Sequence, residues 1–286
     1  MSAPDPATRL QAAIRDNVAA ALAEDLGSGD LTVRLLDADV EARARIVGRE
    51  PFVLAGRPWA ERVFAELDPE LQMQWRFDDG DAIATNDTIC ELRGRARPML
   101  SGERTALNFL QTLSATATVT REYVTAVSHT PARILDTRKT LPGLRTAQKY
   151  AVRCGGGRNH RHGLYDAILI KENHVAAAGG IANAVARARA IDDSVLLEVE
   201  VETLEQLREA LAAGVRRILL DNFSLGDLAE AVVLNRSEGR PPAVLEASGG
   251  LAVGELKGVA ETGVDYVSVG ALTKHVHAAD LSMLFD

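Results

Sequence analysis

Hydrophobic residues in the N-terminal third of the chain follow two different periodicities. In residues 7–26 they recur three or four positions apart, which is the spacing of a helix with one buried face. In residues 71–77 and 89–96 apolar and polar positions alternate, as they do in half-exposed strands, and the turn signal Asp-Asp-Gly at 78–80 lies between them. Residues 1–102 are therefore predicted to form an N-terminal α+β domain, sandwich-like, with a small sheet and flanking helices.

The pattern changes near Ser101, where a long helical run starts at Glu103 and continues through Val127. Beyond it, continuous apolar runs alternate with segments of helical periodicity, such as 204–213 and 225–234, and Gly214 and Gly263 are well placed to end helices. Strands are predicted at 132–137, 165–171, 195–201, 217–221, 243–248 and 265–270. Apolar strands that alternate with helices predict a parallel sheet.

Such βα units can build either an open sheet or a barrel. No GxGxxG motif opens the first unit, and the residues from Ser101 onward are fewer than the ~250 of a full eight-unit barrel. We therefore predict the fold class α/β, with residues 103–286 forming an incomplete α/β barrel of parallel strands. The C-terminal tail is free to pack back on the N-terminal domain.

The composition, 47% hydrophobic and 25% charged, is that of a soluble globular protein. The sequence contains neither a signal peptide pattern nor a run of uncharged apolar residues long enough to span a membrane. Its two cysteines, Cys90 and Cys154, lack metal-ligand spacing and are expected to be reduced thiols. We expect a cytoplasmic protein.

The net charge of −8 argues against nucleic acid or an anionic membrane as a partner, because both select basic surfaces. The charge is nevertheless uneven, since residues 133–171 hold nine Lys or Arg and only two acids, Asp136 and Asp166. This segment is either a solvated basic face or the site of a small anionic ligand.

Two glutamates alternate with apolar residues in the predicted strand 195–201. Glu198 and Glu200 share one face, while Val199 and Val201 share the other. If the apolar face meets the helices, both carboxylates point inward and must find cations or hydrogen-bond donors, which the basic segment can supply. The alternative for this pattern is an exposed edge strand.

Two later loops have the composition of phosphate-binding loops. Ser248, Gly249 and Gly250 lie between a predicted strand and a helix, where they would present backbone N–H groups at the helix N-terminus. Residues 267–272 repeat this arrangement one unit later, and the last two such loops of barrels commonly bind phosphate. A Gly-Gly pair alone is more simply read as a tight turn.

The basic segment also contains motifs typical of a known family. The chain resembles the quinolinate phosphoribosyltransferases, also called carboxylating nicotinate-nucleotide pyrophosphorylases. The motifs that carry the resemblance occur in order over nearly the full length, at 24–32, 103–108, 136–140, 157–161, 171–174, 198–201, 220–222 and 247–250.

This resemblance implies phosphoribosyl transfer from phosphoribosyl pyrophosphate to quinolinate with decarboxylation, which gives nicotinate mononucleotide for de novo NAD biosynthesis. It further implies Mg2+, held by Glu200 and Asp221 directly or through water or substrate, and a homodimer whose active sites each take Arg104 from the neighbouring subunit. The residues that would be catalytic are Lys139, Lys171, Glu200 and Asp221. Those that would bind quinolinate are Arg104, Thr137, Arg138, Lys139, His160, Arg161 and Lys171. Those that would bind phosphoribosyl pyrophosphate are Glu200, Asp221, Ser248, Gly249, Gly250, Ser268, Val269 and Gly270.

Three other functions are compatible with some of these residues. Lysines at barrel strand ends, here Lys139 and Lys171, also serve Schiff-base aldolases. A non-catalytic nucleotide-binding or sensor protein is a second alternative, although Glu200 and Asp221 beside a basic pocket exceed what binding alone requires. A phosphoribosyltransferase that acts on nicotinate itself, without decarboxylation, would need fewer cations for its single carboxylate.

Overall fold

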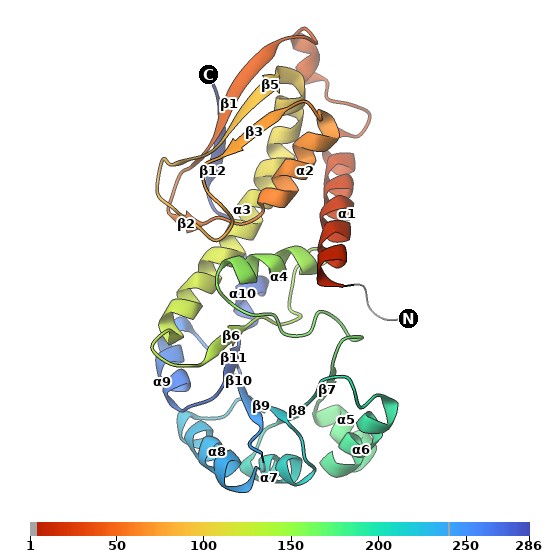
Figure 1. Cartoon of the computed structure of the whole chain (residues 1–286), viewed down its shortest axis with the longest axis vertical. Coiled ribbons are helices and arrows are strands. Elements are labelled where there is room, and N and C mark those ends of the chain that lie inside the picture. Colours follow the sequence, from red (N-terminus) through yellow and green to blue (C-terminus); the bar gives the residue numbers. More distant parts are fainter. Residues whose placement is uncertain (1–4, 240) are drawn as a thin grey trace. The chain divides into compact units, whose positions relative to one another are not determined.

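The computed structural model describes residues 5–239 and 241–286 (Figure 1). These residues form two compact units. The first, which we call the antiparallel unit, contains the chain through Arg121 together with Thr140–Gly156 and Leu272–Asp286. The second, the barrel unit, contains Glu122–Lys139 and Gly157–Ala271. The domain boundary expected between residues 102 and 103 falls inside helix α3 (Ala96–Val127), which contributes to both units.

The antiparallel unit is built on a four-stranded sheet with the order β12-β1-β5-β3. Its strands are β12 (Leu281–Phe285), β1 (Glu41–Gly48), β5 (Thr88–Arg95) and β3 (Gln72–Trp75), and all neighbours are antiparallel. Strands β2 (Phe52–Val53) and β4 (Ala82–Ile83) form a separate short ribbon. Because β12 pairs with β1, the C-terminal tail supplies an edge strand of this sheet.

One face of this sheet is covered by helices. Alternate residues of β1, Ala44 and Ile46, are buried in a core that also contains Trp59 and Phe64 of α2 (Arg57–Leu67) and Leu110 of α3. Buried residues of α1 (Pro6–Leu26) and α4 (Arg145–Cys154) complete the core, and a 3-10 turn (Thr32–Leu35) follows α1. Alternation at period two therefore places one face of the strands inside and leaves the other exposed.

The barrel unit is built on six parallel strands in the order β6-β11-β10-β9-β8-β7. They are β6 (Arg133–Leu135), β11 (Tyr266–Ser268), β10 (Val244–Ser248), β9 (Arg217–Asp221), β8 (Leu197–Val201) and β7 (Ile168–Ile170). Each lies within a stretch predicted to be a strand, and their parallel pairing confirms the predicted α/β class.

The sheet of the barrel unit does not close. Within the described residues its edge strands β6 and β7 are not paired with each other, and beside β6 the chain at Arg158 forms a parallel bridge with Leu135. The incomplete barrel predicted from the sequence is thus confirmed. Its helices are α5 (Glu172–Ala178), α6 (Ile181–Ile191), α7 (Leu204–Ala212), α8 (Leu225–Glu238), the 3-10 turn η2 (Val253–Glu255), α9 (Leu256–Glu261) and α10 (Ala271–Lys274), the last of which begins where the unit ends (Figure 1).

Two glycines let the chain turn sharply after helices of the barrel unit. Gly214 follows α7 with φ 73°, and Gly263 follows α9 with φ 95°. Both lie in the left-handed region that glycine adopts without strain, as the sequence predicted for helix ends. Among the described residues, no helix combines the length and the hydropathy needed to cross a membrane.

Candidate active site

A cavity of about 190 Å³ lies at the C-terminal ends of the barrel strands. The sequence-predicted residues that line it are Thr137, Arg138, Lys139, His160, Arg161, Lys171, Glu200, Ser248 and Ser268. The structure therefore brings together residues that are more than 100 positions apart in the chain, as expected for strand ends that meet at one edge of a parallel sheet. Three further lining residues were not predicted as site residues, namely Leu169, Leu219 and Glu246.

Other predicted residues lie next to the cavity or in the other unit. Asp221 ends β9 directly beside Ser248 of β10 in the strand register. Val269 is buried and directly follows β11. Arg104 belongs to the antiparallel unit, where its side chain is exposed on α3.

The ammonium group of Lys171 donates a hydrogen bond to the carboxylate of Glu200. Lys171 follows β7 directly and Glu200 lies near the end of β8, so the two residues project from neighbouring strands. Burial raises the pKa of Glu200; the Lys171 charge opposes this shift, and the negative charge of Asp221 adds to it. Two carboxylates and a lysine thus meet at one side of the cavity.

Four cations line the cavity, namely Arg138, Lys139, Arg161 and Lys171. Arg161 is partly buried, and its guanidinium donates a hydrogen bond to the carbonyl oxygen of Ala167 at 3.1 Å. Burial lowers the pKa of Arg161, and the nearby positive charge of Arg138 lowers it further. Because like charges are held together here with Lys139 and Lys171, the cavity favours an anionic ligand.

A buried aspartate holds the segment that carries His160 and Arg161. Asp136 follows β6, and its carboxylate accepts hydrogen bonds from the backbone N–H of His160 at 2.9 Å and from the side chain of Asn159 at 2.6 Å. Arg158 also exchanges backbone hydrogen bonds with the β6 region. The basic segment is therefore fixed at the edge of the sheet.

A charge network formed by His160, Glu198, Arg217 and Glu246 borders the cavity, which His160 and Glu246 line. The Arg217 guanidinium donates to Glu198 at 3.0 Å and to Glu246 at 2.5 Å, while the His160 Nε2 lies 2.8 Å from the Glu198 carboxylate. The expectation that Glu198 points inward and finds a cation is confirmed, although Arg217 comes from outside the basic segment. The sequence signal for Arg217 and Glu246 was a charged residue within each apolar strand.

The hydrogen bonds of His160 define its protonation. Its Nδ1 accepts from the backbone N–H of Arg161 at 2.7 Å, so the proton of the neutral ring resides on Nε2, which faces Glu198. Both ring nitrogens are thus engaged within the protein. The ligand atoms of His160, Glu198 and Glu246 lie within 4.8 Å of one another, as in a metal site. Because Arg217 already supplies the positive charge between these carboxylates, we assign no metal to this cluster.

The first predicted phosphate loop has a shape that requires glycine. Gly249 has φ 149°, and a Cβ atom there would lie 3.2 Å from the Asn222 side-chain oxygen. Asn222 itself adopts a left-handed conformation, with φ 58°. The helix expected to start at this loop does not follow directly, because the 3-10 turn begins only at Val253. Gly249 and Gly250 therefore form an open turn after the strand.

The second predicted loop packs against the end of β6. A Cβ atom on Gly270 would lie 2.8 Å from the Lys139 Cδ and 3.5 Å from the Thr137 hydroxyl oxygen. Helix α10 begins directly after Gly270, as the sequence predicted. Glycine thus lets this loop approach the two predicted substrate-binding residues closely.

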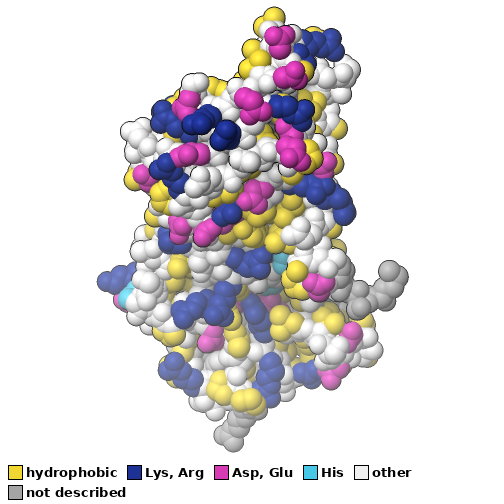
Figure 2. All heavy atoms as spheres, turned by 45° about the horizontal axis from the view of Figure 1, so that its top comes forward, with side chains coloured by type: hydrophobic (Ala, Val, Ile, Leu, Met, Phe, Trp, Pro, Cys, Tyr) yellow, Lys and Arg dark blue, Asp and Glu magenta, His cyan; other side chains and the backbone are white. Residues whose placement is uncertain are grey.

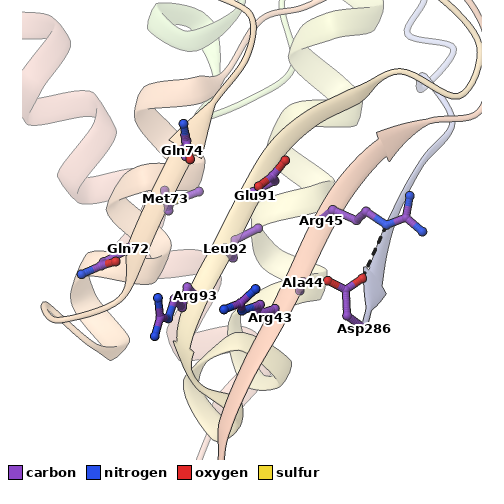
Figure 3. Close-up of a pocket in the computed structure, with 10 residues that line it drawn as sticks. All are labelled: Arg43, Ala44, Arg45, Gln72, Met73, Gln74, Glu91, Leu92, Arg93 and Asp286. Carbon is purple, nitrogen blue, oxygen red and sulfur yellow. Dashed lines mark ion pairs between the residues drawn. The ribbon is translucent and has the colours of Figure 1, made fainter.

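A second hollow, of about 630 Å³, lies on the exposed face of the antiparallel sheet (Figure 3). Arg43 and Arg93 occupy directly opposite positions on β1 and β5, and neither forms an ion pair with another described residue. Arg45 pairs with Asp286 at 3.7 Å. This hollow contains none of the predicted site residues. Basic and acidic side chains are interspersed over much of the surface that Figure 2 shows.

Comparison with known proteins agrees with the motifs in the sequence. The family model described as quinolinate phosphoribosyl transferase, N-terminal domain, matches residues 30–114, and the C-terminal domain model matches residues 116–284. A probable carboxylating nicotinate-nucleotide pyrophosphorylase of Bacillus subtilis is 44% identical over 91% of this chain and 89% of its own length. Its counterpart from Synechocystis is 42% identical over 92% and 89%.

Solved structures agree as well. The nicotinate-nucleotide pyrophosphorylase of Francisella tularensis superimposes with a TM-score of 0.92 at 46% identity and covers 96% of both chains. The sequence, both matched domains and the fold lead to one assignment: this chain belongs to the quinolinate phosphoribosyltransferase family.

Proposed function

We propose that this protein transfers the phosphoribosyl group of phosphoribosyl pyrophosphate to quinolinate and releases pyrophosphate and CO2, giving nicotinate mononucleotide for NAD biosynthesis. The observation that carries the proposal is the meeting of Arg138, Lys139, Arg161 and Lys171 in one cavity. Relatives named carboxylating nicotinate-nucleotide pyrophosphorylase support it.

In this proposal the cations hold the two carboxylates of quinolinate. A charge-assisted hydrogen bond contributes about 1.5–3 kcal/mol, so several together orient the pyridine ring and select a dicarboxylate. Thr137 adds a hydroxyl group at the same side of the cavity. His160 lines the same cavity, but both of its ring nitrogens already have protein partners, so we propose that it supports the site and does not bind quinolinate through its ring.

Glu200 and Asp221 would face the ribose. When pyrophosphate leaves C1 of the ribose, positive charge develops on the sugar ring, by analogy with glycosyl transfer. Fixed carboxylates near that carbon stabilise the charge. The ends of β8 and β9 hold these two side chains close enough for the charge of Asp221 to raise the pKa of Glu200.

The same two carboxylates fit Mg2+, which binds oxygen ligands and usually keeps several waters while it contacts few carboxylates plus substrate phosphates. Mutual repulsion between Glu200 and Asp221 would be relieved by a cation. When bound, the ion would neutralise the leaving pyrophosphate. For the 5′-phosphate we propose the two loops with Ser248, Gly249, Gly250, Ser268, Val269 and Gly270.

Decarboxylation needs no covalent bond to the protein in this proposal. Once the ring nitrogen bears ribose it is positively charged, so the electron pair of the breaking carbon–carboxylate bond is stabilised at the adjacent carbon. CO2 leaves and a proton takes its place. The protein contributes by holding the pyridine ring in position, and this proximity supplies much of the rate enhancement.

We also propose a homodimer in which Arg104 serves the active site of the neighbouring subunit. Its exposed position on α3 leaves it available to a partner chain. The cytoplasmic location stays a prediction from the sequence.

One assay tests the proposed activity. The protein is incubated with quinolinate, phosphoribosyl pyrophosphate and Mg2+, and pyrophosphate and CO2 are both measured. We expect equal amounts of the two products. Neither product with quinolinate, but pyrophosphate when nicotinate replaces it, would point to a transferase that acts on nicotinate. No product with either acid would point to a binding protein or a lyase. Borohydride trapping of a carbonyl substrate on Lys139 or Lys171 would identify the Schiff-base lyase.

A further inference from the structure

Glu246 combines complete burial with an unsatisfied oxygen atom. It lies in the middle of β10, its side chain is fully buried, and it lines the base of the active-site cavity. One carboxyl oxygen accepts the 2.5 Å hydrogen bond from Arg217. The other, Oε1, has no hydrogen-bond partner among the described residues, and the His160 Nε2 lies 3.5 Å away.

The charges around Glu246 do not balance if both buried glutamates are ionised. Glu198 and Glu246 share the single guanidinium of Arg217, and the His160 ring with its accepting Nδ1 is neutral. An uncompensated charge out of water is costly, and a proton on one carboxylate removes it. Although burial alone would raise the pKa of Glu198, the contacts of His160 and Arg217 lower it, so Glu198 keeps its charge.

The proton that neutralises one of the two buried carboxylates therefore belongs on Glu246. Burial raises the pKa of Glu246 to about 7 and the negative charge of Glu198 adds to the shift, while the positive charge of Arg217 and a hydrogen bond from Ser268 oppose it. The geometry agrees, because the buried Oε1 receives no hydrogen bond that would stabilise a negative charge on the carboxylate.

We propose that Glu246 is protonated when the cavity holds its dicarboxylate substrate, and that this neutral carboxyl group is a positioning residue that keeps the base of the cavity free of net negative charge. The inference rests on the proposed function, since it takes quinolinate as the ligand. Loss of the proton would set a second buried anion beneath two substrate carboxylates and would cancel part of the attraction of the cations above.

The charged and titratable groups that contact Glu246 or line the same cavity come from several neighbouring elements. The end of β6 contributes Arg138 and Lys139, the segment beside it His160 and Arg161, and β7 Lys171. Strand β8 contributes Glu198 and Glu200, β9 Arg217, and β11 Ser268 together with Tyr266, whose ring lies 4.8 Å from the Arg217 guanidinium. Within this set the pKa of Glu246 is raised to about 7, so its charge changes near neutral pH.

A measurable pH dependence follows. Substrate binding that favours the protonated form weakens as the proton is lost, by up to about tenfold per pH unit above the pKa. We expect kcat/KM for quinolinate to fall in this way above about pH 7 at saturating phosphoribosyl pyrophosphate and Mg2+. In Glu246→Gln the amide keeps the shape and the neutral charge, so this fall should disappear.

The matched control is Glu230→Gln, which makes the same chemical change at an exposed position of α8 and should keep the wild-type pH profile. The same profile in wild type and Glu246→Gln would overturn the proposal while leaving the proposed function intact. A wild-type protein that fails to turn over quinolinate at any pH would instead refute the proposed function.

A second measurement covers the case in which Glu246→Gln does not fold. Calorimetric titration of quinolinate into the wild-type protein at about pH 7.5, in buffers of different ionisation enthalpy, reports the protons taken up on binding. We expect uptake of up to one proton per site. Binding of quinolinate without proton uptake would overturn the role of Glu246, and absence of binding in the presence of Mg2+ and pyrophosphate would count against quinolinate as the ligand.

Discussion

Lys171 and Glu200 form an ion pair between the ends of neighbouring parallel strands. Lys171 therefore has two predicted roles. It neutralises the Glu200 carboxylate, which would face the ribose, and it is one of the cations that would bind quinolinate. Because Glu200 is only 8% exposed and Lys171 43% exposed, the lysine side chain has room to turn toward a bound carboxylate.

Removal of a cavity cation should weaken the use of quinolinate. We expect Lys171→Ala and Arg161→Ala each to lower kcat/KM for quinolinate tenfold or more, since a lost charge-assisted hydrogen bond costs about 1.5–3 kcal/mol. Steady-state kinetics measures this. Arg187→Ala, at an exposed position of α6, is the control and should behave as wild type. Unchanged kinetics in both cavity variants would place the acid-binding site elsewhere.

Neutralisation of the two strand-end carboxylates should affect turnover more than quinolinate affinity. Glu200→Gln and Asp221→Asn keep the shape of the side chains but remove the charge that would stabilise the transition state. We expect kcat to fall by at least tenfold while KM for quinolinate changes less. A defect restricted to KM for quinolinate would contradict the role at the ribose. Glu230→Gln again serves as the control.

The cavity should discriminate against nicotinate. With one carboxylate missing, at least one cation of the set Arg138, Arg161 and Lys171 would lose its partner while remaining in the cavity, which is penalised. We expect kcat/KM for nicotinate to be at least 100-fold lower than for quinolinate, which corresponds to about 2.7 kcal/mol. Comparable values for the two acids would refute the dicarboxylate assignment.

The buried carboxyl group of Glu246 should make stability depend on pH. Its pKa is raised from 4.5 to about 7 in the folded protein, so the folded state holds the proton more tightly than the unfolded state does. In the wild type, the contribution of Glu246 to the free energy of unfolding is fully present below about pH 4.5 and is lost as the pH rises through about 7. Glu246→Gln lacks this loss. Its melting temperature relative to wild type should therefore increase between about pH 5 and pH 8, and a constant difference would argue against a shifted pKa.

Sharing of Arg104 across a dimer predicts complementation. In a mixed dimer of Arg104→Ala and Lys171→Ala chains, one site has its own intact Lys171 and receives an intact Arg104 from the partner, while the other site lacks both. With random exchange about half of the dimers are mixed, so roughly a quarter of wild-type activity should return. Native mass spectrometry of tagged chains verifies the exchange. Exchange without recovered activity would show that Arg104 does not act in the partner's site.

Local patterns in the sequence were sufficient for the elements of the barrel unit. Each of its six strands lies within its predicted stretch, because burial imposes apolar residues on most strand positions and these are visible without knowing the partner strands. Alternation also showed that Glu198 and Glu200 share one face of their strand, but their inward direction was predicted only on the condition that the apolar face meets the helices. The start of α3 at Ala96 was harder to predict from the sequence, since the helix begins within a run whose alternating pattern predicts a strand.

The sequence by itself determined the family, the order of strands and helices, and most of the residues that line the cavity, because motifs and periodicity are properties of neighbouring positions. Only the tertiary structure decided which distant groups meet. That Arg217 reaches both Glu198 and Glu246 depends on the register of β8, β9 and β10, and that β12 pairs with β1 joins positions more than 200 residues apart. Strand pairing is determined by the packing of the whole unit between residues far apart in the chain, so no local sequence pattern predicts it.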